Sequence, residues 1–243
     1  MYNYVKLFIL IFNITYLDKY VNANIDEPKR NVNSYETIVL KQNNFIAIID
    51  EINDDYIKKI IRDLAYVTIN DVYVYINSNG GSIDAGYDLI NQIKYYNSIG
   101  KTFHCIAKNA FSMAFHIFQS CDHRYILPTS KLMQHQISLG IEGNLYNMMN
   151  YLDMIKEIDK QLHKSTAKKI NMDFDEYINK IKTDWWIYGT DILTYKLADK
   201  FVYIGCSNEL YSTIIEETVD KIIYEDNKFS KIEQIIKKDM CPL

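Results

Sequence analysis

The sequence predicts an α/β fold built around a largely parallel sheet, and two observations carry this prediction. Short runs of β-branched and aromatic residues alternate with stretches whose apolar residues recur at helical spacing, which is typical of strands joined by crossover helices. The run DVYVYIN at 71–77 is β-branched and aromatic almost throughout, as in strands that a parallel sheet buries on both faces. At 243 residues, the chain is long enough for one large domain with appendages.

The first residues have the parts of a secretory signal peptide. An apolar stretch at 7–17 follows a lysine, and Ala23 is a small residue that would precede a cleavage point. We therefore expect 1–23 to be a targeting segment that leads to the secretory pathway or to an organelle, either plastid or mitochondrion. An uncleaved anchor or a buried N-terminal element is the alternative. The polar residues 24–35 are expected to form a linker.

Strand and helix patterns alternate from Glu36 onward. The elements expected in the first half are two short strands around a turn at 42–44, a helix over 54–67, the strand at 71–77, a helix over 85–97 and a strand over 101–107. Those expected in the second half are a helix from Met113, a strand over 123–127, a turn at 128–130, a strand over 131–137, a loop, a long helix from Leu145 to about Ile170, a helix capped by Asp173, and a helix leading into a last strand near Ile204. Apolar residues at helical spacing then predict a helical C-terminal extension over 205–243.

Composition excludes some classes of function. The formal net charge of −4 gives no reason to expect a nucleic-acid partner. The four cysteines are widely spaced and form no CxxC or Cys/His pair, so no zinc or other metal site is expected. Cys105 lies in a strand pattern and is expected to be a buried thiol, since disulfides would require an oxidising compartment. No cofactor is expected.

Ser112 is the candidate nucleophile. It stands between a strand pattern and a helix pattern, so its hydroxyl is expected at a helix N-terminus, where free N–H groups favour a developing negative charge. A serine in that place is otherwise a helix cap. His135 and Asp184 follow it in the chain, and a serine, a histidine and an aspartate can together form a charge-oriented nucleophile.

Five motifs in order resemble the Clp protease family, within the ClpP/crotonase superfamily. They are YINSNGGSIDAG, AFSMA, LPTSKLMQHQ, GIEGN and KTDWW, and the resemblance covers about 36–204. It implies a ClpP/crotonase-like fold of repeated β-β-α units with a long protruding handle helix. In that family Ser112 would be the nucleophile, His135 the general base and Asp184 the residue that orients it.

The resemblance implies further contacts with substrate. The oxyanion hole would be formed by the N–H groups of Gly81 and Met113, and substrate would be held near Gly80, Phe111, Gln136 and Gly140. The implied activity is that of a serine endopeptidase that cuts peptides or unfolded proteins through an acyl-enzyme. Homo-oligomeric rings are implied, with ATP dependence supplied by an AAA+ unfoldase, because the chain has no phosphate-binding loop.

Four residues depart from the family pattern and leave alternatives open. Asn79 replaces a proline, Lys108 and Ala114 replace glycines, and Phe111 replaces a small residue, which would narrow the primary specificity pocket. A weakly active or inactive structural subunit of a mixed ring is therefore a second hypothesis, and acyl-thioester chemistry of the crotonase branch is a third. His116, on the same helical face as Ser112, and Lys108, in a Ser-Lys dyad, are the alternative bases.

Overall fold

A computed structural model describes residues 35–225 and 228–243. The expected targeting segment and nearly all of the expected linker lie outside these residues. Residues 35–243 form one compact unit. Across the described part of the chain, no helix has the length and hydrophobicity that a membrane span requires.

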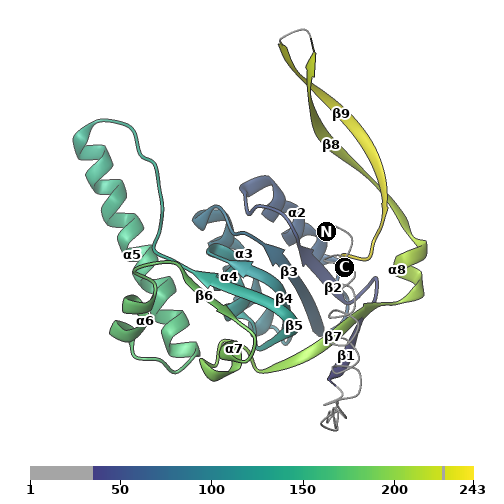
Figure 1. Ribbon diagram of the computed structural model, residues 1–243, viewed down its shortest axis with the longest axis horizontal. Coiled ribbons are helices and arrows are strands. Elements are labelled where there is room, and N and C mark those ends of the chain that lie inside the picture. The colour runs from purple at the N-terminus through teal and green to yellow at the C-terminus, as the bar shows by residue number, and fades with distance from the viewer. Residues whose placement is uncertain (1–34, 226–227) are drawn as a thin grey trace, which may run out of the picture. The chain divides into compact units, whose positions relative to one another are not determined.

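A seven-stranded sheet forms the centre of the fold (Figure 1). Its order is β1 (Glu36–Leu40), β7 (Lys200–Cys206), β5 (His123–Gln134), β4 (Thr102–Phe111), β3 (Asp71–Ser78) and β2 (Phe45–Ile48), with β6 (Trp185–Tyr188) paired to β5. Only the pairing of β6 with β5 is antiparallel among these strands. The predicted parallel α/β fold is therefore confirmed.

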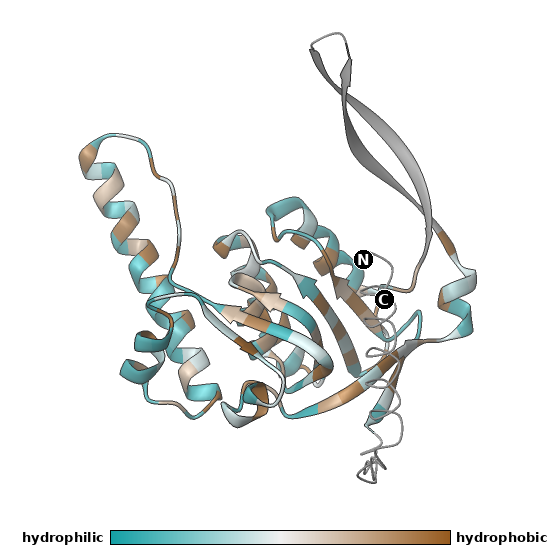
Figure 2. Cartoon of the chain, in the orientation of Figure 1, coloured by the Kyte–Doolittle hydropathy of each residue, from teal (hydrophilic) through white to brown (hydrophobic). Residues whose placement is uncertain are grey.

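Helices pack against one face of the sheet and create the main core. They are α2 (Asp54–Ala65), α3 (Ile83–Ser98), α4 (Met113–Ser120), α5 (Leu145–Lys169), α6 (Phe174–Lys180) and α7 (Asp191–Thr194). Strand β3 is buried on both faces of the sheet. Val72, Val74 and Ile76 point into this core, and Tyr75 belongs to a second cluster on the other face, because successive side chains of a strand point to opposite faces. Figure 2 shows hydrophobic residues along the strands and, between hydrophilic ones, along the helices.

The handle helix α5 is buried against the domain only in its C-terminal part. Its buried residues all lie in the C-terminal part, from Ile155 onward. Near its N-terminus, Leu145 and Tyr146 are exposed apolar residues, and Figure 1 shows this end of α5 standing away from the sheet. The predicted protruding helix is present with nearly the expected bounds.

The first two strands do not pair with each other, although only a short turn separates them. β1 pairs with β7 and β2 pairs with β3, both in parallel. The turn predicted at 128–130 is a bulge within β5, because Ala107 pairs with Ile126 and Asn109 already pairs with Lys131. Ser130 holds the bulge: its Oγ accepts from Leu127 N at 2.7 Å and donates to Ala107 O at 2.5 Å.

The predicted helical extension at the C-terminus is wrong. After the short helix α8 (Asn208–Ser212), the chain forms an antiparallel pair, β8 (Ile214–Glu225) with β9 (Lys228–Asp239). Apolar residues in this stretch fit both a helical and an alternating pattern, and its many β-branched residues favour strands once a partner strand is available.

Cysteines form two disulfides, whereas a buried thiol was expected at Cys105. Cys105 on β4 is joined to Cys121 at the end of α4. Cys206 at the end of β7 is joined to Cys241, which follows β9. Spacing along the chain could not pair them, because the partners meet only when the sheet and the C-terminal strands are in place.

Candidate active site

The turn that follows β3 places backbone N–H groups beside the candidate nucleophile. Gly80 and Gly81 have φ of +95° and +145°, values that favour glycine. A Cβ atom on Gly80 would lie 2.6 Å from Phe111 O, and one on Gly81 would lie 2.2 Å from Ile52 O. Both glycines are therefore required by space as well as by conformation.

Hydrogen bonds hold this turn without the proline that Asn79 replaces. Ile52 N donates to Gly80 O at 2.8 Å, and Ser82 N donates to Ile52 O at 2.7 Å. Ser78 Oγ accepts from Gly80 N at 3.1 Å and donates to Asp50 O at 2.6 Å. The turn is thus fixed on both sides, and these bonds do not occupy the N–H of Gly81.

Ser112 lies at the sharp junction of β4 and α4 in a strained conformation. Its φ is 53° and its ψ is −120°, a rare combination for a residue with a side chain. Its backbone N donates to Met133 O at 3.0 Å, and its carbonyl accepts from Phe115 N at 3.0 Å. Ser112 occupies the N-cap position of α4, but its side chain makes no capping bond, so its hydroxyl is not used to cap the helix.

The N–H of Met113 is the second candidate oxyanion donor. As the first residue of α4, Met113 has no earlier carbonyl of its own helix to bond. Its side chain is buried against Gly86 of α3, where a Cβ atom would lie 2.3 Å from Met113 Cγ. The close packing of α3 on α4 thereby positions this N–H.

His135 and Asp184 are brought together by the register of β5 with β6. Gln134 pairs with Trp185 in antiparallel fashion, so the residue after Gln134 and the residue before Trp185 are neighbours. His135 Nε2 lies 2.9 Å from Ser112 Oγ, and His135 Nδ1 lies 3.9 Å from Asp184 Oδ1. The three residues predicted as a set therefore meet in space. The side chain of Asp184 is 58% exposed, so water can reach the carboxylate.

A small pocket opens beside this serine and histidine. It has a volume of about 70 Å³ and is bordered by Gly81, Ser112, Met113 and His135. Its remaining lining divides into an apolar and a polar group. The apolar residues are Ile83, Ile137 and Leu162, and the polar ones are His116, Gln134, Gln136, Ser138, Asp159 and His163.

Only some of the residues predicted to contact substrate line this pocket. Gln136 lines it, whereas Gly80 supports the turn behind it. Phe111 is absent from the lining of this pocket, and its ring packs edge-on against Trp186 at 5.0 Å between centroids. Gly140 lies in an exposed loop away from the pocket lining.

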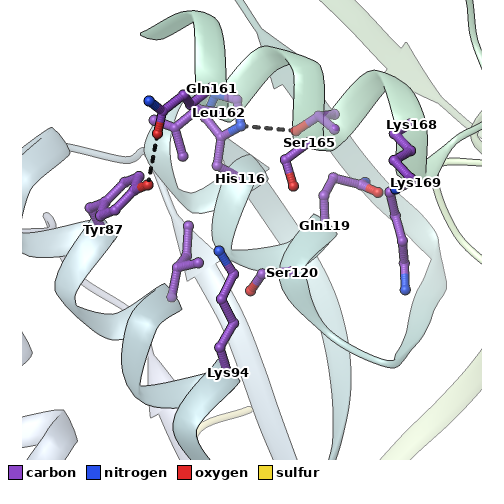
Figure 3. Close-up of a pocket in the computed structure, with 12 residues that line it drawn as sticks. Tyr87, Lys94, His116, Gln119, Ser120, Gln161, Leu162, Ser165, Lys168 and Lys169 are labelled. Atoms are coloured by element: carbon purple, nitrogen blue, oxygen red, sulfur yellow. Dashed lines mark hydrogen bonds between the residues drawn. The ribbon is translucent and has the colours of Figure 1, made fainter. Parts of the chain in front are cut away.

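The alternative bases are not placed to serve Ser112. Lys108 is exposed on β4, and the hydroxyl of Ser112 is in hydrogen-bond contact with His135. His116 is buried, and its Nδ1 lies 3.0 Å from Thr166 Oγ1, a contact drawn as the dashed line from His116 in Figure 3. Its Nε2 lies 2.6 Å from Gln134 Nε2. Burial, together with His163 and His135 nearby, lowers the pKa of His116 to about 3, so this imidazole is neutral.

Sequence reasoning missed a group of buried polar residues at the pocket. His163 and Asp159 lie one turn apart on α5, with His163 Nε2 2.8 Å from Asp159 Oδ1. The signal was available, since an aspartate four residues before a histidine places both on one helix face. Tyr177 closes the group: its hydroxyl lies near Thr166 and Gln134 without a well-aligned hydrogen bond, and burial raises its pKa.

No group of His, Cys, Asp or Glu in residues 35–225 and 228–243 has the arrangement to hold a metal ion. The chemistry that the described residues can supply is that of an oriented hydroxyl and imidazole beside backbone N–H donors. Such a set can carry out nucleophilic acyl transfer.

Comparison with known proteins identifies the family. The Clp protease family model matches residues 27–204. The chain belongs to the Clp protease family. The ATP-dependent Clp protease proteolytic subunit of Pleurastrum terricola is 26% identical over 166 residues, which cover 66% of this chain and 84% of that relative. The Clp protease match includes Ser112, His135 and Asp184 and ends within β7, so the β8–β9 hairpin lies beyond it.

Proposed function

We propose that this member of the Clp protease family is a serine endopeptidase with Ser112, His135 and Asp184 as its triad. The observation that carries the proposal is the 2.9 Å contact between Ser112 Oγ and His135 Nε2, made by a serine side chain that caps no helix. A hydroxyl at its ordinary pKa is a poor nucleophile, and this contact gives its proton a place to go.

The reaction would proceed by acyl transfer. Ser112 Oγ attacks the peptide carbonyl carbon while His135 Nε2 takes the hydroxyl proton. The carbonyl oxygen becomes an oxyanion that accepts hydrogen bonds from Gly81 N–H and Met113 N–H. The tetrahedral intermediate then collapses, the C–N bond breaks, and His135 returns the proton to the leaving amine. Water repeats the sequence on the acyl-enzyme and regenerates Ser112.

Asp184 would keep His135 in the productive tautomer, with a proton on Nδ1 facing the carboxylate, and would stabilise the imidazolium. Each oxyanion donor is worth about 3 to 4 kcal/mol in comparable hydrolases, so the glycine turn contributes about as much as a side chain.

Homo-oligomeric rings are part of the proposal, and the exposed part of α5 supports them. Large apolar side chains there remain in contact with water in the single chain, which is typical of surfaces that associate. They are Leu145, Tyr146, Met149, Tyr151 and Met154. We also propose an AAA+ unfoldase as partner, because the similar protein from Pleurastrum terricola is described as ATP-dependent.

Location in the secretory pathway or in an organelle, plastid or mitochondrion, is likewise proposed. The N-terminal sequence has the pattern of a targeting signal. The two disulfides support an oxidising compartment.

A structural role without strong activity is the second candidate. The gap of 3.9 Å between His135 and the exposed Asp184 favours it, because no direct hydrogen bond then orients the imidazole.

Intact mass after treatment with a fluorophosphonate tests the proposal, with the oligomeric state recorded on the same sample. We expect one added phosphonyl group per chain in the wild type and none in Ser112→Ala. Rings that remain unlabelled would overturn the peptidase assignment and establish the structural candidate.

A further inference from the structure

A large pocket lies between α3, α4 and α5, and the proposed peptidase mechanism makes no use of it (Figure 3). We call it the lysine pocket, after Lys94, Lys168 and Lys169 in its lining. Its volume is about 450 Å³, against about 70 Å³ for the pocket beside Ser112. Because pockets that bind small molecules commonly have volumes of about 300 to 1,000 Å³, the lysine pocket has room for a small organic ligand.

The lining of the lysine pocket carries positive charge. Lys94 comes from α3, Lys168 and Lys169 come from the last turn of α5, and no aspartate or glutamate of the described chain lines the pocket. Within residues 35–225 and 228–243, none of the three lysines forms an ion pair with a carboxylate. In a chain of formal net charge −4, three such cations around one pocket favour a negatively charged ligand.

The position of Lys94 needs a reason beyond helix stability. Positive charge in the last turn of a helix is favoured by the helix dipole, and this effect alone would explain Lys168 and Lys169. Lys94 stands before the last turn of α3, so the dipole does not account for it. Figure 3 shows the Lys94 ammonium and the Ser165 hydroxyl directed towards the space between the three helices.

Lys169 lacks a full counter-charge. Although the residue is exposed as a whole, partial burial of its ammonium, together with nearby Arg124, lowers the pKa of Lys169. The two carboxylates that act on it bond elsewhere: Asp122 accepts from Phe103 N at 2.8 Å, and Asp199 accepts from Arg124 Nη2 at 2.8 Å. A bound anion would therefore stabilise the charged form of Lys169.

The remaining lining offers an apolar wall and a hydroxyl. Ile90 and Leu162 are buried side chains that line the pocket, so an apolar part of a ligand would leave water against them. Tyr87 and Gln161 stand together at one end, with Tyr87 Oη 3.5 Å from Gln161 Oε1. The hydroxyl of Ser165 makes no hydrogen bond within the described chain and can donate to a ligand.

We propose that the lysine pocket binds a small phosphorylated molecule, with the phosphate held by Lys94, Lys168 and Lys169 and an apolar portion lying against Ile90 and Leu162. Lysines act as point charges that suit a phosphate dianion, and the lining contains no arginine to grip a planar carboxylate with two parallel bonds. This site does not depend on the proposed peptidase function. His116 and Leu162 line both pockets, so the ligand would contact two side chains that also border the candidate active site.

Isothermal titration calorimetry with three probes tests the inference on the purified protein. Phenyl phosphate carries the dianion and an apolar ring, inorganic phosphate carries only the charge, and phenol carries only the ring. We expect saturable binding of phenyl phosphate, tighter by about tenfold or more than that of inorganic phosphate, because the ring is removed from water. Phenol should bind more weakly than either.

Variants assign the binding to the lysine pocket. Lys94→Gln should weaken phenyl phosphate binding by about fivefold or more, and combining it with Lys168→Gln and Lys169→Gln should abolish binding. All three lysines are exposed, so the variants should fold. Lys160→Gln is the matched control, because Lys160 is exposed on α5, makes the same change of charge and does not line the pocket.

The outcomes decide each part of the inference. Phenyl phosphate that does not bind saturably, or that binds no more weakly to Lys94→Gln than to Lys160→Gln, would overturn the site. Phenol or inorganic phosphate binding as tightly as phenyl phosphate would overturn the class of ligand. Binding that is lost in Ser112→Ala would place the anion at the candidate active site and so also refute the inference. None of these results depends on labelling of Ser112, so the peptidase assignment and this site can fail separately.

Discussion

Replacing Asp184 by asparagine should slow the reaction of Ser112 by about tenfold, far less than a buried triad aspartate would suggest. Asparagine keeps the shape of the side chain and removes its charge. The carboxylate lies 3.9 Å from His135 Nδ1, a distance at which two unit charges interact by about 1 kcal/mol in bulk water and about 4 kcal/mol at an effective dielectric of about 20.

The solvent exposure of Asp184 decides which of these two interaction energies applies. With Asp184 58% exposed, the interaction with the imidazolium lies near the lower one, at about 1 to 2 kcal/mol. This corresponds to about a five- to thirtyfold loss in rate.

The second-order rate constant for fluorophosphonate labelling measures this effect without knowledge of the substrate. Asp63→Asn, at an exposed position on α2, is the control and should react like the wild type. An unchanged rate in Asp184→Asn would show that the carboxylate does not act on His135. A loss of about ten-thousandfold would also refute the reasoning, because it would require a direct hydrogen bond in the reacting enzyme.

Three further changes test other parts of the structure. Gly81→Ala should lower kcat by about 10² to 10³, because its Cβ would clash with Ile52 O and move an oxyanion donor. Gly205→Ala, with open space around it, is the control and should leave kcat unchanged, and equal activity in the two variants would contradict the role of the turn. The pKa of His116 is lowered to about 3 in the folded protein, so below pH 6.5 the unfolded chain binds more protons than the folded one, and the free energy of unfolding should fall by about 1.4 kcal/mol per pH unit as the pH drops from 6.5 towards 3. Urea titrations of His116→Phe should show a shallower fall with pH, and the same slope as in the wild type would contradict the assignment. Cys241→Ser should lower the stability of the chain by about 3 to 4 kcal/mol in the chain-entropy estimate, since the bond closes a 35-residue separation, and unchanged unfolding would show that this link is not formed.

The sequence alone predicted the parallel fold and the three residues of the candidate triad. Both depend on local patterns: strands and helices follow from the spacing of apolar residues, and the motifs around Ser112, His135 and Asp184 are short enough to be read without a structure. The glycine turn was predicted for the same reason, because Gly80 and Gly81 must adopt conformations that other residues avoid.

Predictions were less accurate where a residue's partner is distant in the sequence. The expected helix after 205 is a hairpin because β8 gains its hydrogen bonds from β9, and no local spacing reveals that pairing. The contact between the rings of Phe111 and Trp186 was likewise not predicted, because Trp186 lies on β6, which follows the long helix in the chain.

What the sequence by itself determined is the order of the elements and the chemical identity of the catalytic candidates. What only the tertiary structure decided is which side chains meet: His135 with Ser112, Cys206 with Cys241, and His116 with His163 and Gln134. The physical reason is that local spacing sets backbone conformation and the face of each element, whereas contacts between elements follow from sheet register and packing, which involve residues far apart in the chain.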